Sequence, residues 1–368
     1  MKRFAKKSLA FLAAGMMCVM ASAQDKALPV EFSGIVCTEV NTNFEGRWNN
    51  ANLMFLTAKA PLWQGATFTG ELGGFHDIGM EKNGGNWWSV SGTHYPDRWG
   101  KIDRQYFTNL PIGNFLTLSQ FNITQQILDN LSAKFGVFKA GEFFVTPTNS
   151  LFLNTSIVTP PVFGNRWYMP CYHQQALGLN LTWEIVPGLT VKNSLFNGVA
   201  SHQWSRVFNF RPGRDGIMDI AQVIYKDADD DNYIGEYRAG IAYADALQPG
   251  QIDKHKSTAW MAHIDQPVVT GAYPVAVTLG GVVSKEKVKY AYQYYNAGAV
   301  VKNVLLPGSR LGVNLCRAYF SDGVHESDVE VEYALPIFKN VEIQPGVHFI
   351  RTSGESMTGA LVRASIFF

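Results

Sequence analysis

The sequence lacks long apolar segments. After Met20 no stretch approaches the roughly 18 consecutive apolar residues of a membrane-spanning helix, so a helical membrane protein is excluded. Cysteine is scarce, with four in 368 residues, and there is neither a CxxC pair nor a cluster of cysteine and histidine. The chain also lacks HExxH, GxSxG, phosphate-loop and dinucleotide-binding motifs. We therefore predict that it is not an enzyme and that it binds no metal or cofactor.

An excess of charge of one sign is also missing. The 31 basic and 30 acidic residues nearly cancel, and no basic patch indicates a nucleic-acid partner. One acidic run places Asp227, Asp229 and Asp231 at positions 1, 3 and 5 of a calcium loop. However, Asn232 stands where that loop needs glycine, and Arg238 stands where it needs a bidentate glutamate. An exposed acidic loop is therefore favoured over a calcium site.

The N-terminal residues have the three parts of a cleavable secretory signal. Four basic residues among the first seven precede an apolar stretch from Ser8 to Met20, which ends in Ala21-Ser22-Ala23. A retained anchor is disfavoured because the apolar stretch is shorter than the ~20 residues that a spanning helix needs. We expect residues 1–23 to be removed and residues 24–368 to be exported.

Three cysteines remain in the expected mature chain. Cys37, Cys171 and Cys316 are odd in number and far apart in sequence. An exported compartment permits a disulfide, but at most one can form within the chain. Isolated buried thiols are therefore favoured over a bridge.

Apolar and polar side chains alternate with a period of two, which is typical of β-strands. Val329, Val331, Tyr333 and Leu335 alternate with glutamate and alanine. The same pattern runs through 176–185 and continues to the last residue, Phe368. Soluble β-proteins seldom end on an exposed Phe-Phe pair, because it would form an adhesive edge. The terminus therefore favours a transmembrane barrel, with one face toward lipid and the other toward a polar lumen.

Turn signals divide the chain into strands. Pro/Gly turns are expected at 186–188, 306–309 and 336–340. Long polar stretches are expected to form the outer loops, at 76–104, 140–175, 201–215, 226–232 and 246–257. About 20 to 22 residues per strand and connection give an all-β transmembrane antiparallel barrel of about 16 strands, with 18 as the alternative.

Several segments resemble the carbohydrate-selective (OprB-type) porins. These are Leu62–Phe68, the block 165–170 with 176–181, the Pro187-Gly188-Leu189 turn, Phe196-Asn197-Gly198, and 343–350. The resemblance covers residues 61–200 and 311–368, although Arg351-Thr352-Ser353-Gly354 replaces the family's usual Asn-Pro-Gly ending. It implies a water-filled outer-membrane channel through which saccharides or similar small polar solutes diffuse passively.

A sugar channel needs a constriction with hydrogen-bond donors, acceptors and aromatic faces. The candidate pore-lining residues are Arg166, Trp167, Glu184, Lys192, Glu330, Glu332 and Arg363. The alternative is that each is a solvated wall residue far from the narrowest point. Four tryptophans in expected loops form either a sugar platform or an interfacial aromatic girdle: Trp87, Trp88, Trp99 and Trp204.

Other functions remain open alternatives. A general or otherwise specific porin shares the same architecture. An outer-membrane barrel enzyme needs a nucleophile beside a histidine, for which His173, His263 and His348 are available. A soluble exported β-sandwich that binds glycans is the third alternative. The expected partners of a barrel are outer-membrane lipid, saccharide solutes and the barrel-assembly machinery acting on the Phe368 strand, with the protein either a monomer or a homotrimer.

Overall fold

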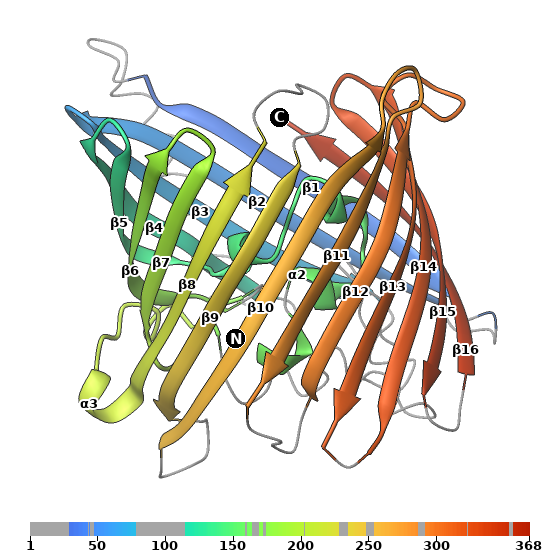
Figure 1. The fold of residues 1–368 in the computed structure, drawn as a ribbon. Helices are drawn as coiled ribbons and strands as arrows, with labels where there is room; N and C mark the ends of the chain where they lie inside the picture. The colour runs from blue at the N-terminus through green and yellow to red at the C-terminus, as the bar shows by residue number, and fades with distance from the viewer. Residues whose placement is uncertain are drawn as a thin grey trace.

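The computed structural model describes residues 29–42, 44, 48–78, 115–158, 160–163, 169–171, 174–201, 203–227, 235–247, 254–285, 291–321, 323–352 and 356–368. Within these residues, sixteen antiparallel strands form one closed barrel (Figure 1). The prediction of sixteen strands is confirmed, and the alternative of eighteen is wrong. The predicted signal segment, residues 1–23, lies outside the described residues.

The strands follow one another around the wall in chain order. Their bounds are β1 Glu31–Thr42, β2 Trp48–Trp63, β3 Ala66–Ile78, β4 Phe115–Leu128, β5 Leu131–Phe138, β6 Ala176–Val186, β7 Leu189–Asn197, β8 Gly216–Lys226, β9 Glu236–Leu247, β10 Lys254–Val269, β11 Val275–Ser284, β12 Ala291–Lys302, β13 Arg310–Phe320, β14 His325–Phe338, β15 Val341–Thr352 and β16 Ser356–Phe367. Each strand pairs with its neighbour in sequence, so the barrel is a continuous meander.

The last strand closes the barrel against the first. β16 pairs with β1, and the backbone N–H of Gly34 donates to the carbonyl of Phe368 at 2.7 Å. The Phe368 N–H returns a hydrogen bond to the Gly34 carbonyl at 3.1 Å. A Cβ at position 34 would lie 2.6 Å from the Phe368 ring, so the glycine provides the room for that ring. Closure leaves no unpaired sheet edge.

The period-two pattern sorts side chains between the two faces of the wall. On β6, Leu179, Leu181 and Trp183 are each more than 40% exposed on the outer face, whereas Asn180 between them is buried. On β14, acidic side chains alternate with Val329 and similar residues and point into the barrel. The outer face is apolar, as contact with lipid requires, and the interior is polar, as the alternation predicted.

The four two-residue turns all lie at one end of the barrel. Short turns join β2–β3, β4–β5, β6–β7 and β14–β15, and Gly188 adopts the positive φ of +83° that the β6–β7 turn requires. β14 continues through Pro336 to Phe338, so the turn expected at 336–340 is only Lys339–Asn340. Pro336 is tolerated in the strand because the register shifts between Pro336 and Phe338, where a ladder hydrogen bond is not needed.

One expected outer loop lies at the opposite end. The acidic run beginning at Asp227 connects β8 to β9, and this connection lies at the end of the short turns. In a meander, successive connections alternate between the two ends of the barrel. The end at which a connection lies therefore depends on its position in the strand order and not on the polarity of its residues. Residues 228–234 are outside the described residues.

Exposed aromatic side chains gather where the short turns begin. Trp63, Trp183, Tyr225, Tyr273 and Phe338 are 47–70% exposed there. Rings at this level are typical of the girdle that a barrel presents to the membrane interface. Among the described residues, no helix is long and apolar enough to span a bilayer.

The three described cysteines are buried and unbridged. Cys37 Sγ lies 3.3 Å from the Ser365 hydroxyl across the β1–β16 seam, and Cys316 accepts a hydrogen bond from the Tyr294 hydroxyl at 3.2 Å. This state agrees with the prediction of isolated buried thiols.

Candidate functional site

The connection between β5 and β6 folds into the barrel. We call residues 139–163 the inner loop. It contains the short helical turns η4 Gly141–Phe143, η5 Asn149–Leu151, α2 Thr155–Val158 and η6 Pro161–Phe163. Figure 1 shows these green segments inside the ring of strands. Among its side chains, those of Phe143, Leu151 and Phe163 are no more than 1% exposed, so the inner loop packs against the wall.

Wall side chains hold the inner loop through its backbone. The Thr148 N–H donates to Asp265 Oδ2 at 2.8 Å, and the N–H groups of Leu153 and Asn154 donate to Glu330 Oε2 at 2.9 and 3.1 Å. Gln344 Nε2 donates to the Leu151 carbonyl at 2.7 Å. A loop inside a barrel has no sheet ladder of its own, so these side chains satisfy backbone groups that burial would otherwise leave without partners.

Glycines on the wall make room for the inner loop. A Cβ at Gly312 would lie 2.6 Å from the Leu151 side chain and 2.8 Å from the Phe152 ring. A Cβ at Gly298 would lie 3.0 Å from the same ring. The inward positions of β12 and β13 are thus small where the apolar part of the inner loop packs.

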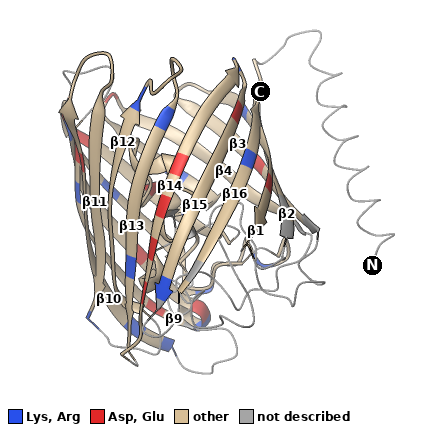
Figure 2. Cartoon of the chain, turned by 90° about the vertical axis from the view of Figure 1, so that its right-hand side faces the viewer, with Lys and Arg blue, Asp and Glu red and all other residues tan. Residues whose placement is uncertain are grey.

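A buried group of ionisable residues lies beneath the inner loop. Acidic positions recur along β14, as Figure 2 shows, and Asp328, Glu330 and Glu332 are fully buried. His348 on β15 is also fully buried, and its Nδ1 lies 2.8 Å from Asp328 Oδ2. Asn154 of the inner loop donates to the same Asp328 oxygen at 2.7 Å.

Among the described residues, a polar cavity lies along β1–β5. Its volume is about 380 Å³, and all of its lining side chains are polar. They are Ser33, Thr57, Lys59, Thr69, Glu71, Gln120, Asn122, Thr124 and Lys134. We call this cavity the passage. Because its lining provides hydroxyls, amides, ammonium groups and a carboxylate, it can exchange hydrogen bonds with a polar solute that sheds water.

Charged pairs stand around the passage. The Lys139 ammonium lies 3.2 Å from Glu71 Oε1, and Glu71 Oε2 accepts hydrogen bonds from Thr57 and Gln120, both at 3.1 Å. The same ammonium lies 4.5 Å from the centre of the Phe55 ring. Glu71 is thereby fixed at the wall with most of its acceptor sites occupied.

The inner loop contributes one carboxylate to this region. Glu142 Oε2 lies 2.8 Å from the Lys192 ammonium, and Oε1 lies 3.5 Å from that of Lys134. Burial opposes ionisation of the Glu142 carboxyl, but the two ammonium groups outweigh burial and hold its pKa below the ordinary value. Glu142 thus lies between a lysine of β5 and a lysine of β7, and it remains charged at neutral pH.

The structure separates the predicted lumen residues into different environments. Lys192 lies beside the passage, in contact with the inner loop through Glu142. Glu330 and Glu332 point inward but are covered by the inner loop. Whether any of them forms the constriction stays a prediction.

The remaining candidates lie elsewhere. Glu184 is exposed at the short-turn end, where its Oε1 accepts a hydrogen bond from the Gly188 N–H at 3.1 Å. Arg363 donates from Nε and from one terminal nitrogen to Glu39 Oε2, at 3.1 and 2.7 Å, across the β1–β16 seam. Arg166 and Trp167 lie outside the described residues.

Two further side chains singled out from the sequence, Trp204 and His263, are also described. Trp204 is 41% exposed, and its indole N–H donates to the Leu116 carbonyl at 3.1 Å. His263 Nε2 lies 2.8 Å from the Thr278 hydroxyl and 3.3 Å from Asp265 Oδ1, under the inner loop. His173, Trp87, Trp88 and Trp99 lie outside the described residues.

Sequence reasoning missed all nine residues that line the passage. Lys59, Glu71, Lys134 and Glu142 were not among the candidates, although the period-two pattern of β2–β5 places the first three on the polar face. That signal was available in the sequence. Nothing local distinguishes Glu142, because its role depends on the inner loop crossing the lumen.

Comparisons with known proteins agree with this architecture. The family described as carbohydrate-selective porin, OprB family, matches residues 64–362. No curated protein matches the sequence. The high-pH structure of Pseudomonas putida OprB is 18% identical, covering 95% of this chain and 96% of that chain, with a TM-score of 0.73. The low-pH structure of the same protein is 17% identical, with 95% coverage of both chains and a TM-score of 0.62. An anion-selective porin from Comamonas acidovorans is 11% identical, covering 92% of this chain and 99% of that chain, with a TM-score of 0.56.

Proposed function

The chain belongs to the OprB family of carbohydrate-selective porins, and we propose that saccharides cross its barrel through the passage between the inner loop and β1–β5. The main support for this path is the cavity of about 380 Å³, which is lined by nine polar residues. The inner loop occupies the β10, β14 and β15 side of the lumen, where it is hydrogen-bonded to the wall. A solute therefore travels along the cationic side of the barrel.

The passage suits sugars because donors and acceptors alternate along it. A sugar hydroxyl both donates and accepts, so it pairs equally with the Lys134 ammonium, the Glu71 carboxylate or the Asn122 amide. Lys192 and Glu142 extend this lining beyond the cavity itself. These groups replace part of the water that a sugar loses as it enters the narrow region.

We assign the covered acids a different role. Glu330 accepts hydrogen bonds from two backbone N–H groups of the inner loop, and Glu332 lies beside it, fully buried. These carboxylates position the wall of the passage and do not contact the solute. Glu184 lies at the mouth, and Arg363 reinforces the seam through Glu39. Arg166 and Trp167 remain candidates for solute contact.

The proposal includes export and assembly. Residues 1–23 act as a cleaved signal, and the β16 strand ending at Phe368 is the element that assembly machinery recognises. The protein acts as a passive channel without catalytic activity. The hydrogen bonds between Phe368 and Gly34 support the role of the terminal strand in assembly, because that strand must be in place before the barrel closes.

Blocking the passage tests its position. We expect Thr124→Trp, on the lumen face of β4, to reduce sugar entry into proteoliposomes several-fold because the indole narrows the cavity. Ile123→Trp on the outer face of the same strand is the matched control and leaves entry unchanged. Swelling in solutions of mono- and disaccharides provides the measurement. Equal entry through both variants would refute the path, and no sugar entry through a conducting wild-type channel would refute the function.

A further inference from the structure

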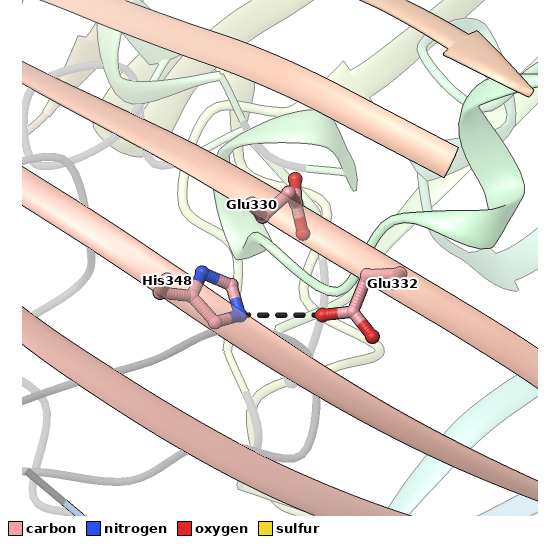
Figure 3. Close-up of side chains that lie close together, drawn as sticks. All are labelled: Glu330, Glu332 and His348. Carbon is pink, nitrogen blue, oxygen red and sulfur yellow. Dashed lines mark ion pairs between the residues drawn. The ribbon is translucent and has the colours of Figure 1, made fainter. Parts of the chain in front are cut away.

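Three potential metal ligands converge beneath the inner loop. One ligand atom from each of Glu330, Glu332 and His348 lies within 4.8 Å of the others, and all three residues are fully buried (Figure 3). Figure 3 shows His348 and Glu332 facing each other from neighbouring strands. Gly346 pairs with Glu332 in the register, and a Cβ there would lie 2.2 Å from Glu332 Oε1. The glycine therefore leaves space for the carboxylate at this point.

Two atoms in this group make no hydrogen bond within the described residues. They are Glu332 Oε1 and His348 Nε2. They lie 3.3 Å apart as an ion pair, longer than the roughly 2.7–2.9 Å of a charge-assisted hydrogen bond. Fully buried polar atoms without hydrogen bonds are rare, because each costs about 1–3 kcal/mol relative to a paired one.

The group gathers three carboxyl groups around one imidazole. Asp328, Glu330 and Glu332 supply the carboxyl groups, and His348 supplies the imidazole. Carboxylates buried away from water are stable only when protons or a cation neutralise them. Fixed amide donors from Asn154, Asn314 and Gln344 satisfy some oxygen lone pairs but carry no charge.

We propose that Glu330, Glu332 and His348 bind one divalent cation of the zinc class. A nitrogen ligand with two carboxylates suits Zn²⁺ better than Ca²⁺ or Mg²⁺, which prefer oxygen alone. Tetrahedral bonds of about 2.0–2.1 Å place neighbouring ligand atoms roughly 3.3 Å apart. His348 Nε2 and Glu332 Oε1 already have that spacing.

The surroundings of His348 fit this role. Its Nδ1 lies 2.8 Å from Asp328 Oδ2. With the Nδ1 proton donated to that carboxylate, a neutral His348 would present its Nε2 lone pair to the cation. A carboxylate behind a ligating histidine is the usual arrangement in zinc sites, because it orients the ring and raises its basicity. Asp328 is therefore a positioning residue, and the three others are ligands.

Binding at this site would fasten the inner loop to the wall. Glu330 contacts the cation on one side and the N–H groups of Leu153 and Asn154 on the other. The bound ion therefore restrains the segment that bounds the passage. This role is independent of which solute crosses the channel.

Metal content measured on intact protein tests the proposal. Full-length protein is extracted in detergent without chelators, incubated with Zn²⁺, desalted and analysed by inductively coupled plasma mass spectrometry. We expect about one zinc per chain in wild type, and at least a tenfold loss in Glu332→Gln and His348→Gln. Glu342→Gln on β15 removes an acid that pairs with Arg310 outside the group, so this control retains the metal.

Two further results decide the outcome if a variant fails to fold. Co²⁺ bound to wild type should give the visible absorption of a tetrahedral nitrogen–oxygen site, and excess EDTA should lower the melting temperature of wild type but not of Glu332→Gln. Less than one tenth of a zinc per chain in folded wild type would overturn the proposal. Equal zinc in wild type and both ligand variants would also overturn it, because the ion would then bind elsewhere.

Discussion

Replacing Glu330 by leucine tests whether this side chain holds the inner loop. Glu330 Oε2 accepts the N–H groups of Leu153 and Asn154, and Oε1 accepts Asn314 Nδ2 at 2.9 Å. Leucine keeps comparable bulk but leaves two buried backbone donors without partners. Each costs about 1–3 kcal/mol, so docking weakens by roughly 2–6 kcal/mol. Even the lower value raises the undocked fraction about 30-fold.

Single-channel recording in planar bilayers measures this effect. We expect Glu330→Leu to show frequent transitions to a larger conductance, because the undocked loop no longer narrows the lumen. In buffer that contains EDTA, where no cation contributes, Glu330→Gln keeps an oxygen for both N–H groups and should behave much more like wild type. Glu342→Gln, away from the inner loop, controls for loss of an acid on the same wall. A leucine variant with the conductance and noise of wild type would show that Glu330 does not hold the loop.

Three other changes probe the passage, the packing and the closure. Glu142→Gln removes a carboxylate from the passage and should move the reversal potential in a salt gradient toward anion selectivity; an unchanged potential would place Glu142 away from the ion path. The carboxyl pKa of Glu142 in the folded protein lies below the ordinary value of 4.5, so the carboxylate loses its charge only when the pH falls through that lower pKa. The ion selectivity of wild type should therefore stay constant from pH 7 to about pH 5. Gly312→Ala places a methyl group against the inner loop and should lower the melting temperature by several degrees in scanning calorimetry, whereas an unchanged value would mean that the loop yields freely. Deleting Phe368 removes both backbone hydrogen bonds to Gly34 and should reduce the yield of folded barrel on heat-modifiability gels; a normal yield would exclude a role in closure.

The wall of the barrel was predictable because its signal is local. Alternate residues on a strand point to opposite faces, so Val329 and Glu330 were assigned to lipid and lumen from neighbouring positions alone. The positions of β6 and of the β16 terminus follow from the same pattern. The misplacement of the connection at Asp227 has a physical cause: its polarity resembles that of an outer loop, and only a complete strand count assigns its end.

The candidate site was not predictable in the same way. The hydrogen bond from Leu153 to Glu330 joins residues 177 positions apart, and no local pattern specifies that contact. A polar inward side chain on a strand is compatible with water, with a covering loop or with an ion pair. The sequence therefore identified which face Glu330 and Glu332 occupy but not what covers them.

The inner loop determines which wall charges reach the lumen. It covers the acids of β14, whereas Lys59 and Lys134 on β2 and β5 line the passage. Around the passage four lysines, including Lys139 and Lys192, face two glutamates, which leaves a formal excess of two positive charges among the described residues. The whole chain is almost neutral, so this local excess arises from where the charged side chains lie and not from composition. On the proposed path, a solute that crosses beside the inner loop meets this cationic surface, and undocking the loop would expose the acids of β14 to the lumen.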